Sequence, residues 1–216
     1  MFEGEIKVII DLGNSDTRTY FMMGGKTGAF DLSNRFYNLS ENYEVPEDYN
    51  ETNSVIIEHE GLLFGGGELV VKEFPAMSFR PTAIDKKYSS LSSVLSIKYV
   101  LTKAYLWVSE MTGTDLEDLN LKFHITCLLP PSDIEIGAKE MNSRIREIES
   151  IKTIIPNFEA KIDIESVNIL PEGFAAFMGV LFRRGMKFRA GYEYLTKQKT
   201  LILDIGAGTA DAVVVD

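Results

Sequence analysis

Two stretches of the sequence share one pattern, and together they decide the fold class. The first stretch reads Glu5-Ile6-Lys7-Val8-Ile9-Ile10-Asp11-Leu12-Gly13-Asn14-Ser15-Asp16-Thr17. The second reads Lys199-Thr200-Leu201-Ile202-Leu203-Asp204-Ile205-Gly206-Ala207-Gly208-Thr209-Ala210-Asp211. Each is a strand-like run that ends in Asp, followed by an apolar residue, a glycine turn and a second strand pattern. The repeated pattern predicts two β-hairpins, over residues 5–23 and 199–215.

Between the two hairpins, strand patterns alternate with helix patterns. Strands are expected at 27–37, 123–129 and 161–170, and helices at 94–108, 134–148 and 171–183. The segment from about 38 to 88 is polar and loop-rich, and we expect it to form a small inserted subdomain. This alternation is typical of an α/β protein.

The composition is that of an ordinary globular chain, with 216 residues, 45% hydrophobic and 25% charged. The 22 basic and 32 acidic residues give a net charge of −10, which argues against binding nucleic acid phosphates or an anionic membrane. The single cysteine, Cys127, fits a reducing compartment. The acidic start is unlike a signal peptide, and no apolar run approaches the roughly 18 residues of a membrane span. We expect a cytoplasmic protein without direct nucleic acid or membrane partners.

The two Asp-x-Gly turns are the features best suited to bind a nucleotide. A tight glycine turn can aim several backbone N–H groups at one phosphate. Asp11 and Asp204 end the preceding strands, where their carboxylates could serve Mg²⁺ together with water and phosphate oxygens. One such turn alone is more typical of an ordinary hairpin with a solvated Asp. Two matching copies favour a clamp around the β- and γ-phosphates.

Other nucleotide and catalytic motifs are incomplete. Gly25-Lys26-Thr27 lacks the earlier glycine of a Walker A loop, because Tyr20 stands in its place. The second turn has Asp211 where a dinucleotide fingerprint needs its third glycine. His124 and Cys127 are three residues apart on a predicted strand, which places them on opposite faces. Zinc chemistry and a Ser/His/Asp triad therefore have little support.

Glu172 is a third candidate, in the stretch Leu170-Pro171-Glu172-Gly173-Phe174-Ala175-Ala176-Phe177. The pattern places it in the first turn of a helix that begins at Pro171. Such a carboxylate can stabilise the helix dipole by about 0.3–1 kcal/mol. It can also orient, or take a proton from, a water that attacks the γ-phosphate. The residues alone leave both interpretations open.

These three elements, in this order, resemble the motifs of the actin, sugar-kinase and heat-shock-chaperone ATPase superfamily. The sequence around Glu172, together with Asn34-Arg35-Phe36 and Gly65-Gly66-Gly67-Glu68, is most similar to bacterial, phage and archaeal actin-like proteins of the ParM type. The resemblance implies an actin-like, ribonuclease H-like α/β fold, with a mixed sheet flanked by helices and a small inserted subdomain. Residues 1–184 would be lobe I, with the insertion at about 38–88, and 185–216 would be the start of a truncated lobe II.

The resemblance also implies a role for each site residue. Asp11 would hold Mg²⁺ through water, Asp204 would be a second acidic contact to the metal or water and a catalytic residue, and Glu172 would position the lytic water. The phosphates of ATP or GTP would be wrapped by Gly13, Asn14, Ser15, Asp16, Thr17 and Arg18 from the first turn and by Gly206, Ala207, Gly208 and Thr209 from the second. Arg18 stands where eukaryotic actin has a phosphate-contacting lysine, and it is equally an ordinary solvated charge on a strand. Ala207 replaces an acidic residue of eukaryotic actin, as in plasmid-type relatives.

The function implied by the resemblance is an ATPase that polymerises into nucleotide-dependent filaments. Relatives of this type segregate plasmid or other DNA through an adaptor protein, so the expected partners are further copies of the chain and an adaptor. The alternatives on the same fold are a chaperone or reactivase ATPase and a small-molecule kinase, which would need a further Asp as base. The adenosine-binding motif of the family is missing from these 216 residues, so this piece alone is expected to be inactive.

Overall fold

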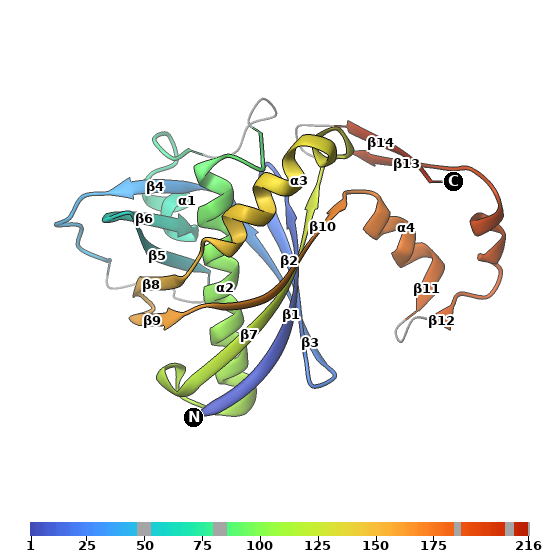
Figure 1. Cartoon of the computed structure of the whole chain (residues 1–216). Coiled ribbons are helices and arrows are strands. Elements are labelled where there is room, and N and C mark those ends of the chain that lie inside the picture. The colour runs from blue at the N-terminus through green and yellow to red at the C-terminus, as the bar shows by residue number, and fades with distance from the viewer. Residues whose placement is uncertain (47–52, 80–85, 184–186, 206–209, 216) are drawn as a thin grey trace.

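The computed structural model describes residues 1–46, 53–79, 86–183, 187–205 and 210–215. Its first five-stranded sheet has the strand order β10-β7-β1-β2-β3 (Figure 1). These strands are β1 (Phe2–Leu12), β2 (Asp16–Met23), β3 (Lys26–Ser33), β7 (Leu119–Leu129) and β10 (Asp163–Pro171). Strands β1, β2 and β3 are antiparallel neighbours, whereas β1, β7 and β10 are parallel. The predicted mixed sheet is therefore confirmed.

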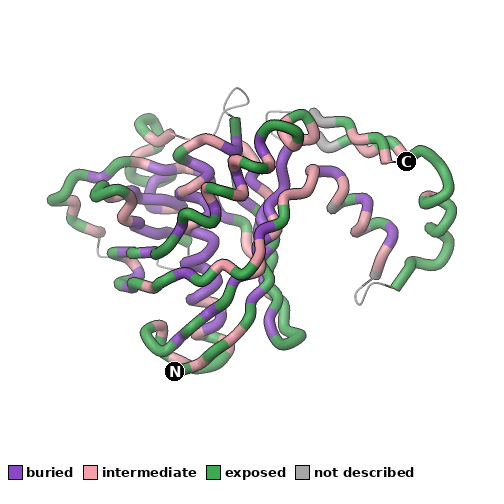
Figure 2. The backbone as a smooth tube through the Cα atoms, in the orientation of Figure 1, coloured by how far each residue is buried: buried purple, intermediate pink, exposed green. Residues whose placement is uncertain are grey.

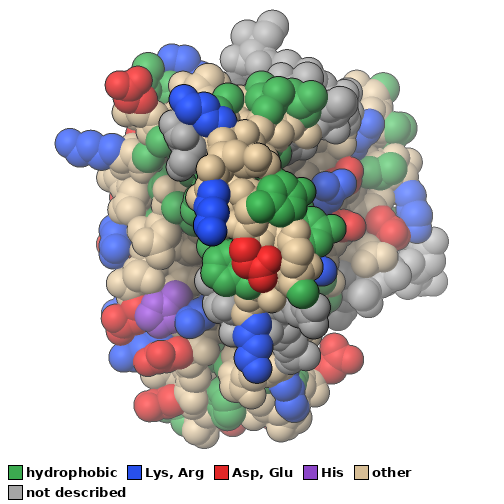
Figure 3. Space-filling model, turned by 90° about the vertical axis from the view of Figure 1, so that its right-hand side faces the viewer, with side chains coloured by type: hydrophobic (Ala, Val, Ile, Leu, Met, Phe, Trp, Pro, Cys, Tyr) green, Lys and Arg blue, Asp and Glu red, His purple; other side chains and the backbone are tan. Residues whose placement is uncertain are grey.

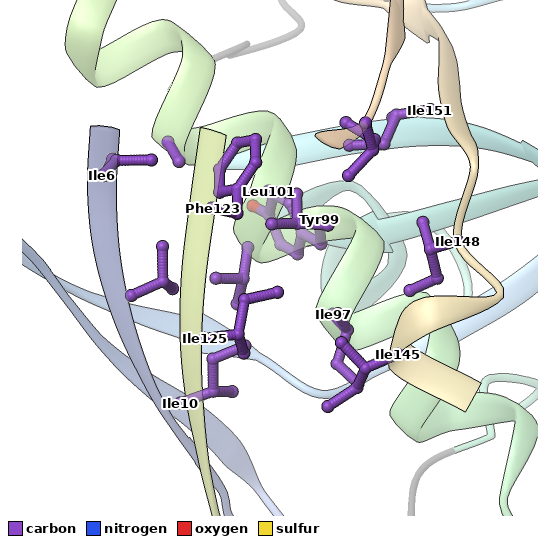
Figure 4. Close-up of a cluster of buried hydrophobic side chains, with 14 of the residues drawn as sticks. Ile6, Ile10, Ile97, Tyr99, Leu101, Phe123, Ile125, Ile145, Ile148 and Ile151 are labelled. Atoms are coloured by element: carbon purple, nitrogen blue, oxygen red, sulfur yellow. The ribbon is translucent and has the colours of Figure 1, made fainter. Parts of the chain in front are cut away.

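Two long helices cover one face of this sheet. They are α2 (Leu91–Thr112), which precedes β7, and α3 (Pro131–Arg146), which follows β7. Side chains of β1 alternate between buried and exposed, as expected for a sheet with one covered face. The buried side chains meet those of α2 and α3 in one core (Figure 4), which includes Ile6, Ile10, Ile97, Tyr99, Phe123, Ile125 and Ile145. The core fixes the position of the carboxyl ends of the parallel strands.

A second five-stranded sheet has the order β4-β6-β5-β8-β9. Its strands are β4 (Phe36–Leu39), β5 (Ser54–His59), β6 (Leu62–Gly67), β8 (Ser150–Ile155) and β9 (Phe158–Lys161), and the short α1 (Glu68–Glu73) follows β6. Strands β8 and β9 come from the segment after α3, and β8 pairs with β5. The second sheet thus combines the insertion expected at 38–88 with a hairpin that the sequence analysis did not identify.

The C-terminal part of the chain extends away from the two sheets and is mostly exposed (Figures 1 and 2). It contains α4 (Phe174–Leu181), β11 (Phe182–Arg183), β12 (Lys187–Phe188), β13 (Thr200–Ile205) and β14 (Ala210–Val215). Two short 3₁₀ helices, η1 (Leu116–Asp118) and η2 (Glu193–Lys197), complete the structure. None of the helices in the described ranges is long and apolar enough to cross a membrane.

Two expected elements differ from the structure. The helix expected from Pro171 begins only at Phe174. Pro171 still belongs to β10, where it lies opposite Leu129, and Gly173 has a non-helical backbone conformation with φ +69°. The strand expected at 27–37 is two strands in different sheets, β3 and β4. Residues 34 and 35 join them, so the chain changes sheets at Asn34.

Candidate functional site

The first predicted hairpin is formed by β1 and β2, with Asp11 opposite Arg18 and Leu12 opposite Thr17. Within its turn the Gly13 N–H donates a hydrogen bond of 3.1 Å to the Asp11 carbonyl oxygen. A Cβ atom on Gly13 would collide with the carbonyl oxygen of Asp16, so the turn needs glycine at this position. Asp11, Gly13, Asn14 and Ser15 are all half-buried, and Asp16 is exposed.

Asn34 fixes this turn from the buried side. Its backbone N–H donates to the Ser15 carbonyl oxygen at 2.9 Å, and its side-chain amide donates to the Gly13 carbonyl oxygen. Its side-chain oxygen accepts hydrogen bonds from the hydroxyl groups of Thr17, at 2.8 Å, and Ser96. In the sequence, Asn34 stands out only as part of the resemblance to actin-like proteins. Asn34 lies inside the single strand expected at 27–37, so no local pattern in the sequence predicts this role.

Thr17 and Arg18, which were also predicted to contact phosphate, lie on strand β2 and not in the turn itself. Thr17 is buried, and its hydroxyl is bound to Asn34 inside the protein. Arg18 has a largely exposed side chain, and its Nε lies 3.9 Å from a carboxylate oxygen of Asp31 on β3. The solvated interpretation of Arg18 therefore fits its surroundings, while the turn itself is formed by residues 13–16.

Glu172 lies directly after β10, where its backbone N–H donates to the Leu129 carbonyl oxygen at 2.7 Å. Its carboxylate oxygen Oε1 accepts a hydrogen bond of 2.8 Å from the Nζ of Lys87, and both side chains are 9% exposed. The sequence pattern had placed Glu172 in the first helical turn. This prediction is wrong, because α4 begins only after Gly173 and Glu172 lies before the helix. Lys87 was not a candidate in the sequence analysis, since no local motif marks it.

Cys127 shows that these charges gather at one end of the sheet. It lies on β7 between Ile10 of β1 and Ile169 of β10. Burial and, to a smaller extent, the negative charges of Asp11 and Glu172 together raise the pKa of the Cys127 thiol to about 12, while the positive charge of Lys87 opposes this shift. The carboxyl ends of parallel strands meet at the same edge, so Asp11 and Glu172 are brought together there.

The second predicted hairpin is formed by β13 and β14, which pair in antiparallel register. A Cβ atom on Gly173 would lie 2.9 Å from Val213 Cγ2 and 3.7 Å from Ile202 Cγ2, so this hairpin packs beside the residue that follows Glu172. Gly206, Ala207, Gly208 and Thr209 lie outside the described residues, as does the side chain of Asp204. Their contribution to a phosphate clamp stays a prediction.

The described residues fit a nucleotide with its magnesium ion. The side-chain oxygen of Asn14 is buried in the first turn without a hydrogen-bond partner, and a water or ligand donor would satisfy it. No cluster of three or more His, Cys, Asp or Glu side chains suited to a metal occurs among the residues described. Mg²⁺ does not need one, because it commonly takes one or two carboxylates and completes its shell with water and phosphate oxygens.

Comparison with known proteins identifies the fold as actin-like. No protein-family model matches the chain, and no curated protein matches it significantly in sequence. The crystal structure of the actin-like protein Alp7A matches with a TM-score of 0.72 and 17% identity over 99% of this chain and 56% of Alp7A. Apo psk41 ParM matches with a TM-score of 0.65 and 12% identity over 98% of this chain and 62% of that protein. An AlfA filament bound to AMPPNP matches with a TM-score of 0.62 and 18% identity over 97% of this chain and 64% of AlfA. The chain thus spans between about half and two thirds of the length of these proteins.

Proposed function

We propose that the chain is part of an actin-like ATPase that assembles into filaments when nucleotide is bound. The observation that carries this proposal is the strand register, which places Asp11 opposite Leu128 and ties Glu172 to Leu129 at the same edge of the sheet, next to a second hairpin of the same pattern. The fold supports it, since similar structures include an AlfA filament bound to AMPPNP. In this proposal residues 1–184 form lobe I and 185–216 begin lobe II.

The phosphates of ATP or GTP would be held by the two hairpin turns. Asp11 and Asp204 would hold Mg²⁺, which when bound neutralises charge on the phosphate oxygens. Glu172 would accept a hydrogen bond from the attacking water and orient it toward the γ-phosphate. The phosphate contacts would come from Gly13, Asn14, Ser15 and Asp16 on one side, with Thr17 and Arg18 adjoining this turn, and from Gly206, Ala207, Gly208 and Thr209 on the other.

The proposed partners are further copies of the protein in the filament and an adaptor that contacts plasmid or other DNA. The net charge of −10 supports an adaptor, because the protein itself would be repelled by DNA phosphates. The same charge argues against an anionic membrane surface as the site of assembly. We place the protein in the cytoplasm, which its single buried cysteine also fits.

The test is sedimentation of the full-length protein over a wide concentration range with ATP, with GTP, with ADP and without nucleotide. The proposal predicts a pellet that forms with one of the triphosphates and declines as phosphate is released. Phosphate release without any nucleotide-dependent pellet would favour a chaperone-type ATPase. Turnover that appears only after addition of a sugar or small acid would favour a kinase.

A further inference from the structure

Lys87 is a buried cation in direct contact with the proposed catalytic carboxylate. The residue is 7% exposed, and its Nζ lies 2.8 Å from Oε1 of Glu172. Lysine is almost never buried to this extent unless it is paired, because the ammonium group loses its hydration. The contact joins positions 85 residues apart in sequence. The tertiary fold therefore brings Lys87 and Glu172 together, since neither residue is near the other in sequence and both are buried.

The chain that follows Lys87 is held in place by packing and by hydrogen bonds. Tyr88, the next residue, is 4% exposed and packs so closely on Gly137 of α3 that a Cβ atom there would collide with its ring. Ser90 caps α2 by accepting a hydrogen bond of 3.2 Å from the Ser93 N–H. The Ser89 N–H closes a turn onto the Lys86 carbonyl oxygen at 3.0 Å. The ammonium group of Lys87 therefore extends from a fixed point of the scaffold.

Glu172 is anchored on the opposite side of the contact. Its backbone is tied to Leu129 at the end of β7, and Gly173 beside it touches the second hairpin. A carboxylate whose one oxygen is held by a fixed ammonium group has a defined orientation. Orientation is what a water-positioning group must supply, since misplacement by about 1 Å can lower a rate about 10²-fold.

We propose that Lys87 is a positioning residue, which orients the Glu172 carboxylate for nucleotide hydrolysis. This inference rests on the proposed function. It predicts that loss of the ammonium group lowers kcat and leaves nucleotide affinity nearly unchanged, because the phosphates are held by the hairpin turns. A purely structural pair would instead change stability without a separate effect on kcat.

The experiment measures phosphate release and nucleotide affinity in the full-length protein and in four variants. Lys87→Met is expected to lower kcat on the order of 10²-fold with little change in Kd. Lys87→Arg keeps the charge and is expected to restore part of the rate. Ethylammonium added to Lys87→Ala is expected to restore part of it as well, which a packing defect would not allow. Lys86→Met, at the exposed neighbouring residue, is the matched control and is expected to behave as wild type.

The double variant Lys87→Met/Glu172→Gln provides a neutral pair, should Lys87→Met alone fail to fold. If Lys87 acts through Glu172, the double variant turns over at the rate of Glu172→Gln. A further tenfold loss would overturn the inference, and so would wild-type kcat in Lys87→Met or a rate that neither Arg nor ethylammonium restores. A wild-type protein that hydrolyses no nucleotide would overturn the proposed function first, and the role of Lys87 with it.

Discussion

The two hairpins share one sequence pattern and have different surroundings. Ile10 and Leu203 each precede the Asp of their turn, yet Ile10 is 0% exposed and Leu203 is 64% exposed. Strand β1 is flanked by β2 and β7 and covered by α2, whereas β13 pairs with β14 alone among the described strands. Figure 3 shows the side of the molecule toward which the C-terminal part extends, where hydrophobic side chains lie among charged ones. The pattern sets the local hairpin, and the neighbouring elements decide its burial.

This difference gives the two hairpins different mechanical roles in the proposed site. The first turn is bound by Asn34 and backed by the core, so its shape is set before any ligand arrives. The second hairpin contacts Gly173 through Ile202 and Val213 and is otherwise largely exposed. In the proposed ATPase, the first hairpin is a fixed half of the site. The position of the second hairpin depends on its contact with Gly173, next to Glu172.

The largest expected effect concerns the residue that lies between the two hairpins. Glu172→Gln in the full-length protein is expected to slow phosphate release about 10²–10⁴-fold, because a positioned base or water-orienting carboxylate is lost. Nucleotide affinity should stay close to that of wild type. Glu165→Gln, an exposed carboxylate on β10, is the matched control. Equal rates for Glu172→Gln and wild type would leave Glu172 a structural partner of Lys87.

A direct test of the comparison exchanges the matching residues of the two hairpins. Ile10→Ala is expected to lower the free energy of unfolding by about 2–5 kcal/mol, because it leaves a cavity in the core. Leu203→Ala is expected to change it by less than about 0.5 kcal/mol, as at other exposed positions. Denaturant unfolding of the two variants measures both values. Similar losses in the two would mean that the second hairpin is buried in solution.

The sequence was sufficient to predict the two hairpins and the α/β class, because both depend on local patterns, whereas the mixed sheet followed from the resemblance. Alternating apolar residues and the Asp-x-Gly turns specify β1, β2, β13 and β14 without reference to the rest of the chain. The sequence could not place Lys87 beside Glu172, because the contact spans 85 positions and carries no motif. It also misplaced the start of α4, since Pro171 is favourable both at a helix start and at the end of an edge strand.

A smaller effect is expected from the metal side of the first hairpin. Asp11→Asn should weaken nucleotide affinity about 10–100-fold in the presence of Mg²⁺, as is typical when an outer-shell carboxylate is lost. In the presence of EDTA, wild type and variant should bind equally weakly. Titration calorimetry under both conditions measures the difference. If wild-type affinity does not depend on Mg²⁺, Asp11 has no metal to hold.

The rigidity of the first turn can be tested through Asn34. Asn34→Ala is expected to lower the free energy of unfolding by about 1–3 kcal/mol, because it leaves buried partners without hydrogen bonds. Asn38→Ala, at an exposed position of β4, is the matched control. Nucleotide affinity should fall in Asn34→Ala as well, since the turn loses its support. Retained affinity would show that the turn keeps its shape without Asn34.

The smallest expected effect concerns Cys127, which lies buried on β7 beside Ile10 of the first hairpin. Its pKa is raised from 9.0 to about 12, mainly by burial and further by Asp11 and Glu172. The folded state therefore holds the thiol proton more tightly than the unfolded state, so stability is full below pH 9 and falls as the pH rises toward 12. Between pH 8 and pH 10, wild type should lose about 1 kcal/mol more than Cys127→Ala, in which this titration is absent. Other groups titrate equally in both proteins and cancel in the difference. Parallel pH curves would mean that water reaches Cys127, and the first hairpin would then be no drier there than the second.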